Sequence, residues 1–376
     1  MTIGLDASRA NRPNKTGVEW YSYYLIQELK KITPDDIDVI LYTNGKLTGG
    51  LENCPKNFTE KKLSWPCLPA GRRQYLWTQI RLWWELIIKP PDVLFVPAHT
   101  IPFLPIRKKT KVYVTVHDVG FKRYPKLYKK IQFYYHELTM KRLRNRADKI
   151  ITISDFSKQE IIDLYRVKPA KIVVIPLGYD QDSYNDKVLA DQNILNKYNI
   201  TQPYLLYLGR LERKKNIGNM IKALAYIKVA KSELKLVLAG NSGNEYENIK
   251  KIIIDNKLEK EVLLPGYIAE ADLPAVIKMA EIFLFPTLYE GFGLPILQAL
   301  AIGTPVVTSD LKPHKEVAGG AAALADPKNP VSIAQQINKI LKDREFATEL
   351  KNQGLKRASE FSWAKTAATT LLIITR

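Results

Sequence analysis

The chain of 376 residues lacks the features that mark disulfide-rich, zinc-binding and membrane-spanning proteins. Its two cysteines, Cys54 and Cys67, form no C-x-x-C pair, which argues against a cysteine zinc site or a disulfide scaffold and favours a reducing compartment. No run reaches the roughly 18 apolar residues that a membrane-spanning helix needs. The first residues show no basic segment followed by an apolar one, so we expect no signal peptide and a cytoplasmic location.

Motifs of several common enzyme classes are also missing. There is no G-x-G-x-x-G fingerprint for a dinucleotide, no Ser-His-Asp order and no pair of carboxylates at hydrolase spacing. The aspartates of "DDID" (35–38) make a D-x-D, but they lead into an expected strand, and we interpret them as a turn. We therefore expect neither a metal site nor a bound cofactor.

Positive charge is in excess. There are 57 Lys and Arg against 38 Asp and Glu, a net charge of +19, and most of the surplus lies in residues 1–180. Such a surplus indicates an anionic partner, which could be nucleic acid, an acidic membrane or a phosphorylated substrate, or it is only a solvated basic surface.

Two segments of the basic half interleave cations with aromatic residues. One is 122–146, and the other is 71–90, which holds Arg72, Arg73, Arg81, Trp77, Trp83 and Trp84. The pattern is typical of amphipathic helices at the surface of an anionic membrane. Core aromatics beneath a basic face would give the same pattern, and so would a single-stranded nucleic acid site.

Short β-branched runs alternate with helical stretches along the whole chain. In the first half, the expected strands are 2–6, 38–43, 92–97, 111–118, 149–154 and 171–178. In the second half they are 204–210, 235–240, 262–267, 282–287 and 305–310. This alternation predicts an α/β protein with two doubly wound, Rossmann-like domains, divided within the polar stretch 180–202.

Candidate ligand-binding residues follow the expected strands of the second half, because ligands of open α/β sheets lie at the carboxyl ends of the strands. Arg210 and Lys215 come after one strand and suit a diphosphate, although "RKK" is also ordinary for a solvated loop. In "EGFGLP" (290–295) two glycines allow close backbone approach, and the proline suits the first turn of a helix over 295–302. Glu290 would accept hydrogen bonds from sugar hydroxyls, or it merely caps a tight turn.

The first half offers a weaker candidate. His117 and Asp118 end an expected strand in "VTVHDVGF", where an imidazole serves as acid, base or hydrogen-bond donor in a cleft, or is simply structural. Gly17 opens the first expected helix and could face the same cleft.

Taken together, these motifs resemble family 4 (GT4) of the glycosyltransferases, whose members have the GT-B fold. The resemblance runs nearly end to end, through "GLDASRANRPNKTGVEWYSYYLIQEL", "VTVHDVGF", "ITISDFSKQEI", "VIPLGYD", "YLGRLERKKN", "PTLYEGFGLPILQALAIGTPVVTSD" and the terminal "FSW". The "HD" pair at 117–118 is similar to a pair that the mannosyltransferase-like branch of the family carries at the end of a strand. The resemblance implies an N-terminal acceptor domain (1–180), a C-terminal sugar-nucleotide domain (181–358) and a last helix (359–376) that returns to the first domain.

The resemblance also implies roles for individual positions. Arg210 and Lys215 would bind the donor diphosphate, and His117 would lie beside the reacting carbon of the donor sugar. The remaining donor contacts would come from Gly17, Tyr267, Ile268, Glu290, Phe292, Gly293, Leu294 and Gln298. At Gln298 the family has a glutamate that holds the nucleotide ribose, so we expect a working but looser grip on the nucleotide.

The implied reaction is retaining, metal-independent transfer of a hexosyl group. The donor would be GDP-mannose or a UDP-hexose, and the acceptor a hydroxyl of a glycan or lipid-linked sugar in cell-surface polysaccharide synthesis. An anionic membrane surface is an expected partner, on which the protein would be peripheral, and nucleic acid is not. The alternatives are a non-catalytic sugar-nucleotide-binding protein and a GT-B sugar-nucleotide epimerase.

Overall fold

The computed structural model describes residues 1–13, 15–64, 77–228 and 233–376, so Cys67, Arg72 and Arg73 lie outside the described residues. The chain forms two compact units, residues 1–178 together with 363–376, and residues 179–362. The expected division after residue 180 falls in the structure after Gly178, and the returning segment begins at Trp363 rather than at residue 359.

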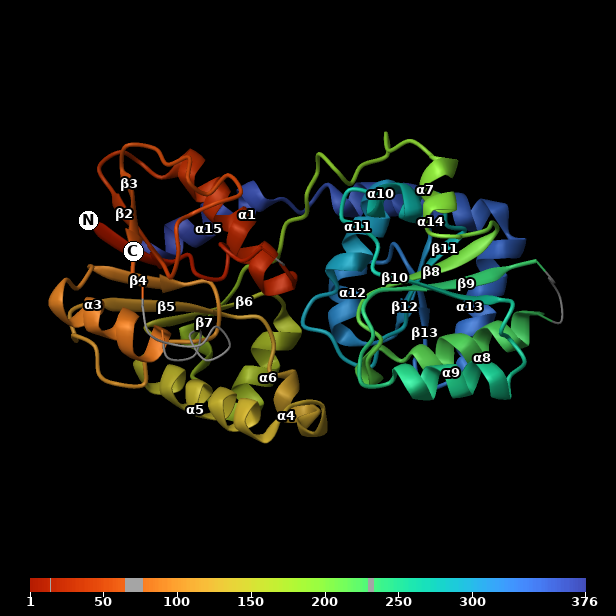
Figure 1. Cartoon of the computed structure of the whole chain (residues 1–376), viewed down its shortest axis with the longest axis horizontal. Helices are drawn as coiled ribbons and strands as arrows, with labels where there is room; N and C mark the ends of the chain where they lie inside the picture. The colour runs from red at the N-terminus through yellow and green to blue at the C-terminus, as the bar shows by residue number, and fades with distance from the viewer. Residues whose placement is uncertain (14, 65–76, 229–232) are drawn as a thin grey trace. The chain divides into compact units, whose positions relative to one another are not determined.

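The first unit is built on a parallel sheet of seven strands in the order β3-β2-β1-β4-β5-β6-β7 (Figure 1). The strands are β1 (Thr2–Asp6), β2 (Asp38–Thr43), β3 (Phe58–Lys62), β4 (Val93–Val96), β5 (Lys111–Val116), β6 (Lys149–Thr152) and β7 (Ile172–Val174). The helices are α1 (Gly17–Ile32), α3 (Trp83–Ile88), α4 (Gly120–Arg123), α5 (Lys130–Arg146), α6 (Asp155–Tyr165) and α15 (Trp363–Ile374), with a π-helix, η1 (Trp77–Leu82), before α3.

The second unit has a parallel sheet of six strands in the order β10-β9-β8-β11-β12-β13 (Figure 1). The strands are β8 (Tyr204–Leu208), β9 (Lys235–Ala239), β10 (Val262–Gly266), β11 (Ile282–Phe285), β12 (Val306–Ser309) and β13 (Ala323–Ala325). The helices are α7 (Gln192–Lys197), α8 (Ile217–Lys228), α9 (Tyr246–Asp255), α10 (Leu273–Lys278), α11 (Leu294–Ile302), α12 (Lys312–Ala318), α13 (Pro330–Lys342) and α14 (Arg344–Ala358). A 3-10 turn, η4 (Arg213–Lys215), follows β8.

The central strands are continuous apolar runs because helices cover both faces of each sheet. Every residue of β4, β8 and β11 is buried. Two edge strands were not predicted. The sequence "FTEKK" of β3 is mostly charged because it pairs on one side only and is partly exposed, and β13 has only three residues.

The last helix, α15, belongs to the first unit and packs against α1. The Trp363 ring stacks on Tyr24 with ring centroids 5.5 Å apart. The Thr366 hydroxyl donates a hydrogen bond of 2.8 Å to the carbonyl of Pro176. The end of the chain therefore completes the core of the unit with which the chain begins.

In both sheets the strand order reverses next to the first strand of the unit, at β1 beside β4 and at β8 beside β11. Ligands of doubly wound folds bind outside the carboxyl ends of the strands at such a point. The loops that follow these strands are therefore where the functional residues of each unit are expected.

Candidate functional site

In the second unit, Lys215 and Glu290 form an ion pair beyond the carboxyl ends of β8 and β11. Only 15% of the Lys215 side chain and 16% of the Glu290 side chain are exposed. The Lys215 ammonium also lies 5.4 Å from the centroid of the Phe285 ring. Burial would raise the pKa of Glu290, but the charges of Lys215 and Lys214 outweigh it and hold this pKa below its ordinary value. Glu290 is therefore an anion whose oxygens accept hydrogen bonds.

The loop after Glu290 leads directly into α11, and the helix predicted over 295–302 is confirmed. Gly293 is the N-cap residue, with φ of 103°, a left-handed conformation that favours glycine. As a glycine, Gly293 provides no side-chain cap for this end. The first backbone N–H groups of a helix have no partner within the helix, and together with the helix dipole they attract an anion. Phe292 is buried against Phe361, with ring centroids 5.9 Å apart, and this contact anchors the loop.

The sequence analysis missed His314, which is fully buried on α12 behind this loop. Its Nε2 lies 3.0 Å from the Thr287 hydroxyl, and a Cβ built on Gly293 would lie 3.6 Å from the imidazole ring. Burial lowers the pKa of His314 to about 4, so the ring is neutral at neutral pH. In the sequence, His314 belonged to no predicted element and to no motif.

Other predicted donor contacts are spread around the same edge of the sheet. Arg210 is 65% exposed and pairs with Glu212 at 3.2 Å, so the structure does not join it to the Lys215–Glu290 pair. After β10, the Tyr267 side chain is exposed and Ile268 is buried. The side chain of Gln298, half-buried on α11, makes no hydrogen bond with any residue that the structure describes.

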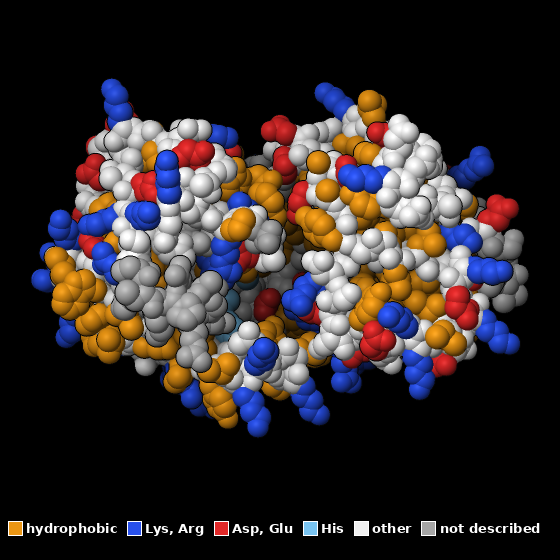
Figure 2. Space-filling model, in the orientation of Figure 1, with side chains coloured by type: hydrophobic (Ala, Val, Ile, Leu, Met, Phe, Trp, Pro, Cys, Tyr) orange, Lys and Arg blue, Asp and Glu red, His pale blue; other side chains and the backbone are white. Residues whose placement is uncertain are grey.

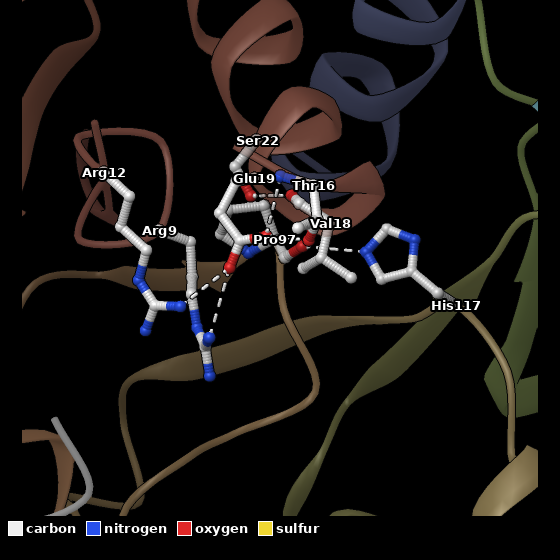
Figure 3. A network of polar contacts seen from close by, with 8 residues as sticks. All are labelled: Arg9, Arg12, Thr16, Val18, Glu19, Ser22, Pro97 and His117. Carbon is white, nitrogen blue, oxygen red and sulfur yellow. Dashed lines mark hydrogen bonds and ion pairs between the residues drawn. The ribbon is translucent and has the colours of Figure 1, made fainter. Parts of the chain in front are cut away.

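In the first unit, His117 follows β5 and is 8% exposed. Its Nε2 lies 3.2 Å from the carbonyl oxygen of Pro97, as Figure 3 shows. A carbonyl only accepts, so Nε2 carries the proton and the neutral ring presents Nδ1 as an acceptor. Burial lowers the pKa of His117 and keeps this ring neutral. Tyr21 packs edge-on against it, with ring centroids 4.6 Å apart.

A buried carboxylate organises the loop between β1 and α1 (Figure 3). Glu19 accepts hydrogen bonds from the guanidinium groups of Arg12 at 2.9 Å and Arg9 at 3.3 Å, and it closes a capping box with Thr16. Burial would raise the pKa of Glu19, but the Thr16 hydroxyl and the two arginines hold this pKa below its ordinary value. Gly17 opens α1 beside this network, and a Cβ built on it would meet no atom within 4 Å. The glycine therefore faces open space.

Among the residues that the structure describes, no three His, Cys, Asp or Glu side chains are grouped as metal ligands. No helix within the described ranges is long and apolar enough to cross a membrane.

Comparison with known proteins places this architecture and these loops in one family. The model "Glycosyltransferase Family 4" matches residues 15–183, and the model "Glycosyl transferases group 1" matches residues 191–357. The chain is 33% identical to the O-antigen chain mannosyltransferase B of Escherichia coli over 72% of this chain and 71% of that protein.

Solved structures agree on the fold. Sucrose-phosphate synthase from Thermosynechococcus elongatus superimposes with a TM-score of 0.74 at 20% identity, covering 99% of this chain and 98% of that one. The Anabaena protein HepE in complex with UDP and glucose gives 0.73 at 16% identity, covering 100% and 99%.

The two sheets and their loops thus define a GT-B glycosyltransferase with two Rossmann-like units. The chain belongs to family 4 of the glycosyltransferases, in its mannosyltransferase-like branch.

Proposed function

We propose that this protein transfers a hexosyl group, most simply mannosyl, from a nucleotide-diphosphate sugar to a hydroxyl of a glycan or lipid-linked acceptor. The acceptor belongs to cell-surface polysaccharide synthesis, in line with the similarity to the O-antigen chain mannosyltransferase B. The observation that carries the proposal is the buried Lys215–Glu290 pair before the uncapped start of α11.

The second unit offers complementary groups for the two halves of the donor. Lys215 and the N–H groups at the start of α11 suit the diphosphate, and exposed Arg210 adds a cation beside the same strand end. Glu290 is ionised and suits the hydroxyls of the sugar. The loop that carries exposed Tyr267 and buried Ile268 is the proposed contact for the base.

The proposed chemistry is a front-face displacement with retention of configuration. The bond between C1 of the sugar and the diphosphate oxygen breaks, and its electron pair leaves with the diphosphate. The acceptor oxygen then bonds to C1 from the same face and gives its proton to a diphosphate oxygen. Neutral His117 contributes Nδ1 as an acceptor toward a hydroxyl of the sugar.

We further propose that the reaction needs no metal ion. The positive groups named above stabilise the charge that develops on the leaving diphosphate, a role that preorganised cations and helix N-termini serve in phosphate chemistry. The proposal is wrong if EDTA abolishes transfer and added Mg²⁺ restores it.

Donor identity and reaction class are tested together by incubating the protein with GDP-mannose and with UDP-hexoses, with and without an acceptor glycan. A transferase releases nucleotide diphosphate faster when acceptor is present. An epimerase interconverts the sugars without acceptor, and a binding protein holds the nucleotide without consuming it. Either of these last two results would reject glycosyl transfer.

A surface of the first unit supports an anionic membrane as a further partner. Seven of its large exposed apolar side chains lie on η1 and α3, in the loop after β4 and on α5, and we call this set the apolar face: Ile80, Trp84, Ile88, Leu104, Ile131, Tyr134 and Leu138. Trp83 donates to the Pro105 carbonyl at 2.9 Å and Arg142 to the Leu104 carbonyl at 3.2 Å, so this loop joins α3 to α5.

Cations surround the apolar face, as Figure 2 shows for the edge of the unit formed by α3 and α5. The exposed cations on and beside α5 are Lys126, Lys129, Lys130, Lys141 and Arg144. An apolar strip flanked by Lys and Arg is the pattern of a helix that lies in the headgroup region of anionic lipid.

Sedimentation with phosphatidylglycerol vesicles tests this contact. We expect the protein to sediment at low salt and to be released at high salt, and the triple change Ile131→Ser, Tyr134→Ser, Leu138→Ser to reduce binding at least tenfold. Leu189→Ser is the control, since Leu189 is 82% exposed in the second unit. Failure of the unchanged protein to sediment, or equal loss in the control, contradicts the proposal.

A further inference from the structure

Three of the four histidines of the chain line one cavity of the first unit. His99 follows β4, His117 follows β5, and His136 lies on α5. The cavity has a volume of about 130 Å³, and its described lining also includes Asp118, Phe121 and Met140. A cavity of about 150 Å³ accommodates one six-membered ring. The space therefore matches part of a single sugar ring rather than an extended chain.

Among the residues that the structure describes, two of these imidazoles have no hydrogen-bond partner. Nδ1 of His136 is buried, and the His99 ring is half-buried. The two rings lie close together, with centroids 4.7 Å apart, and Phe121 packs on His136 at 5.1 Å. Buried polar groups are normally hydrogen-bonded, so the buried Nδ1 of His136 at the cavity wall points to a ligand that supplies the hydrogen bond, and the His99 ring beside it is available to the same ligand.

The charge of the lining selects the kind of ligand. No Lys or Arg is among the described residues that line the cavity, and Asp118 is its one carboxylate. Burial lowers the pKa of both His99 and His136, and the charge of nearby Arg9 adds to the effect on each ring. For His99, the neighbouring His136 ring lowers the pKa further. Neutral imidazoles both donate and accept, as hydroxyls do, whereas a phosphate in the cavity would meet the Asp118 carboxylate and no cation of the described lining.

We propose that this cavity binds the acceptor through an uncharged pyranose ring, with His99 and His136 as hydrogen-bond partners of its hydroxyls. The inference rests on the proposed function, because it uses His117 as the residue beside the reacting carbon. It adds the acceptor class: the sugar that receives the new bond is neutral, and any phosphate of a lipid-linked acceptor lies outside the cavity.

The four histidines make the proposal testable by NMR of the imidazole rings in the full chain. Variants His99→Gln and His136→Gln assign the signals, and methyl α-D-mannopyranoside and methyl α-D-glucopyranoside are the probes. We expect at least one of the two sugars to shift the His99 and His136 signals and to leave His314, in the second unit, unmoved. Mannose 6-phosphate should bind at least tenfold more weakly than methyl mannoside.

A second titration, with nucleotides, tests the proposed function separately from the cavity proposal. GDP and UDP are titrated into the same sample, and the matching nucleotide should shift His314, which lies behind the Glu290 loop. In His99→Ala and His136→Ala, the KM for the acceptor sugar should rise at least tenfold while the nucleotide Kd stays the same.

The outcomes are distinct. If a nucleotide shifts the His314 signal but neither methyl glycoside shifts the His99 or His136 signals, the cavity proposal is wrong and the donor site stands. The cavity proposal is also wrong if mannose 6-phosphate binds as tightly as methyl mannoside. A sugar response with no nucleotide response rejects the donor site.

Discussion

Lys215 and Glu290, 75 positions apart in the chain, neutralise each other at the carboxyl edge of the second sheet. A diphosphate that binds Lys215 must share this cation with Glu290. We therefore expect Glu290→Gln to leave nucleotide diphosphate binding unchanged or tighter, and to lower transfer roughly 10- to 100-fold, as loss of a charged hydrogen bond of about 1.5–3 kcal/mol implies. Isothermal titration and initial rates measure the two effects separately.

Removal of the cation should give the opposite pattern. Lys215→Met takes away a diphosphate contact and should weaken nucleotide binding at least tenfold, by roughly 1.5 kcal/mol or more. For Glu290→Gln, the matched control is Glu281→Gln. Glu281 is an exposed acid that precedes β11, whereas Glu290 follows this strand. If Glu290→Gln weakens nucleotide binding as much as Lys215→Met does, the division of roles between the two residues is wrong.

Gln298→Glu should tighten the donor site. The structure leaves the Gln298 side chain half-buried on α11 without a hydrogen bond to any described residue, so it is available to a ribose hydroxyl. A carboxylate there would make a charge-assisted bond and lower the donor Kd about tenfold. The matched control is Gln336→Glu, at a half-buried position of α13. A donor Kd that rises in Gln298→Glu would contradict the expectation.

Stability should fall as the pH drops below about 6.5, the ordinary pKa of histidine. His314 has a folded pKa of about 4, so between pH 6.5 and 4 the unfolded chain binds a proton that the native state does not. Burial lowers the pKa of the other three histidines as well, so their protonation in the unfolded chain also reduces stability as the pH falls. Urea denaturation from pH 7 to pH 5 measures the slope.

His314→Gln isolates one contribution to that slope. The free energy of unfolding should depend less steeply on pH in this variant, with up to one proton fewer taken up on unfolding, whatever its stability at pH 7. An unchanged slope would mean that His314 titrates normally in the folded protein.

Trp363→Ala should destabilise the first unit. Trp363 is buried and stacks on Tyr24, and truncation of a buried tryptophan costs about 3–5 kcal/mol. Leu372→Ala on the same helix is the control, since Leu372 is half exposed and should cost less than about 1 kcal/mol. Equal losses in thermal or urea denaturation of the two variants would show that α15 does not anchor the unit as described.

Much of the fold follows from sequence patterns, because buried parallel strands such as β8 and β11 are uninterrupted apolar runs. The charged edge strand β3 was missed, since its residues read as a polar loop, and so was the three-residue β13. The polar stretch 180–202, in which the division between the domains was predicted, holds α7 and lies in the second unit.

The residues of the candidate site also divide into those that the sequence could predict and those that it could not. Lys215 and His117 could be proposed from the sequence because they lie in segments that follow predicted strands and carry polar chemistry. His136 and His314 lie on helices, Glu19 is buried by a loop that folds back on it, and their roles depend on tertiary contacts that leave no local pattern.

The most direct test of the account is proton and phosphorus NMR of the protein with GDP-mannose or a UDP-hexose and a methyl glycoside acceptor, in the presence of EDTA. The account predicts release of one nucleotide diphosphate and a new glycosidic anomeric signal with the configuration of the donor. An inverted product, a reaction that needs a metal ion, or a donor panel that is neither bound nor consumed would contradict it.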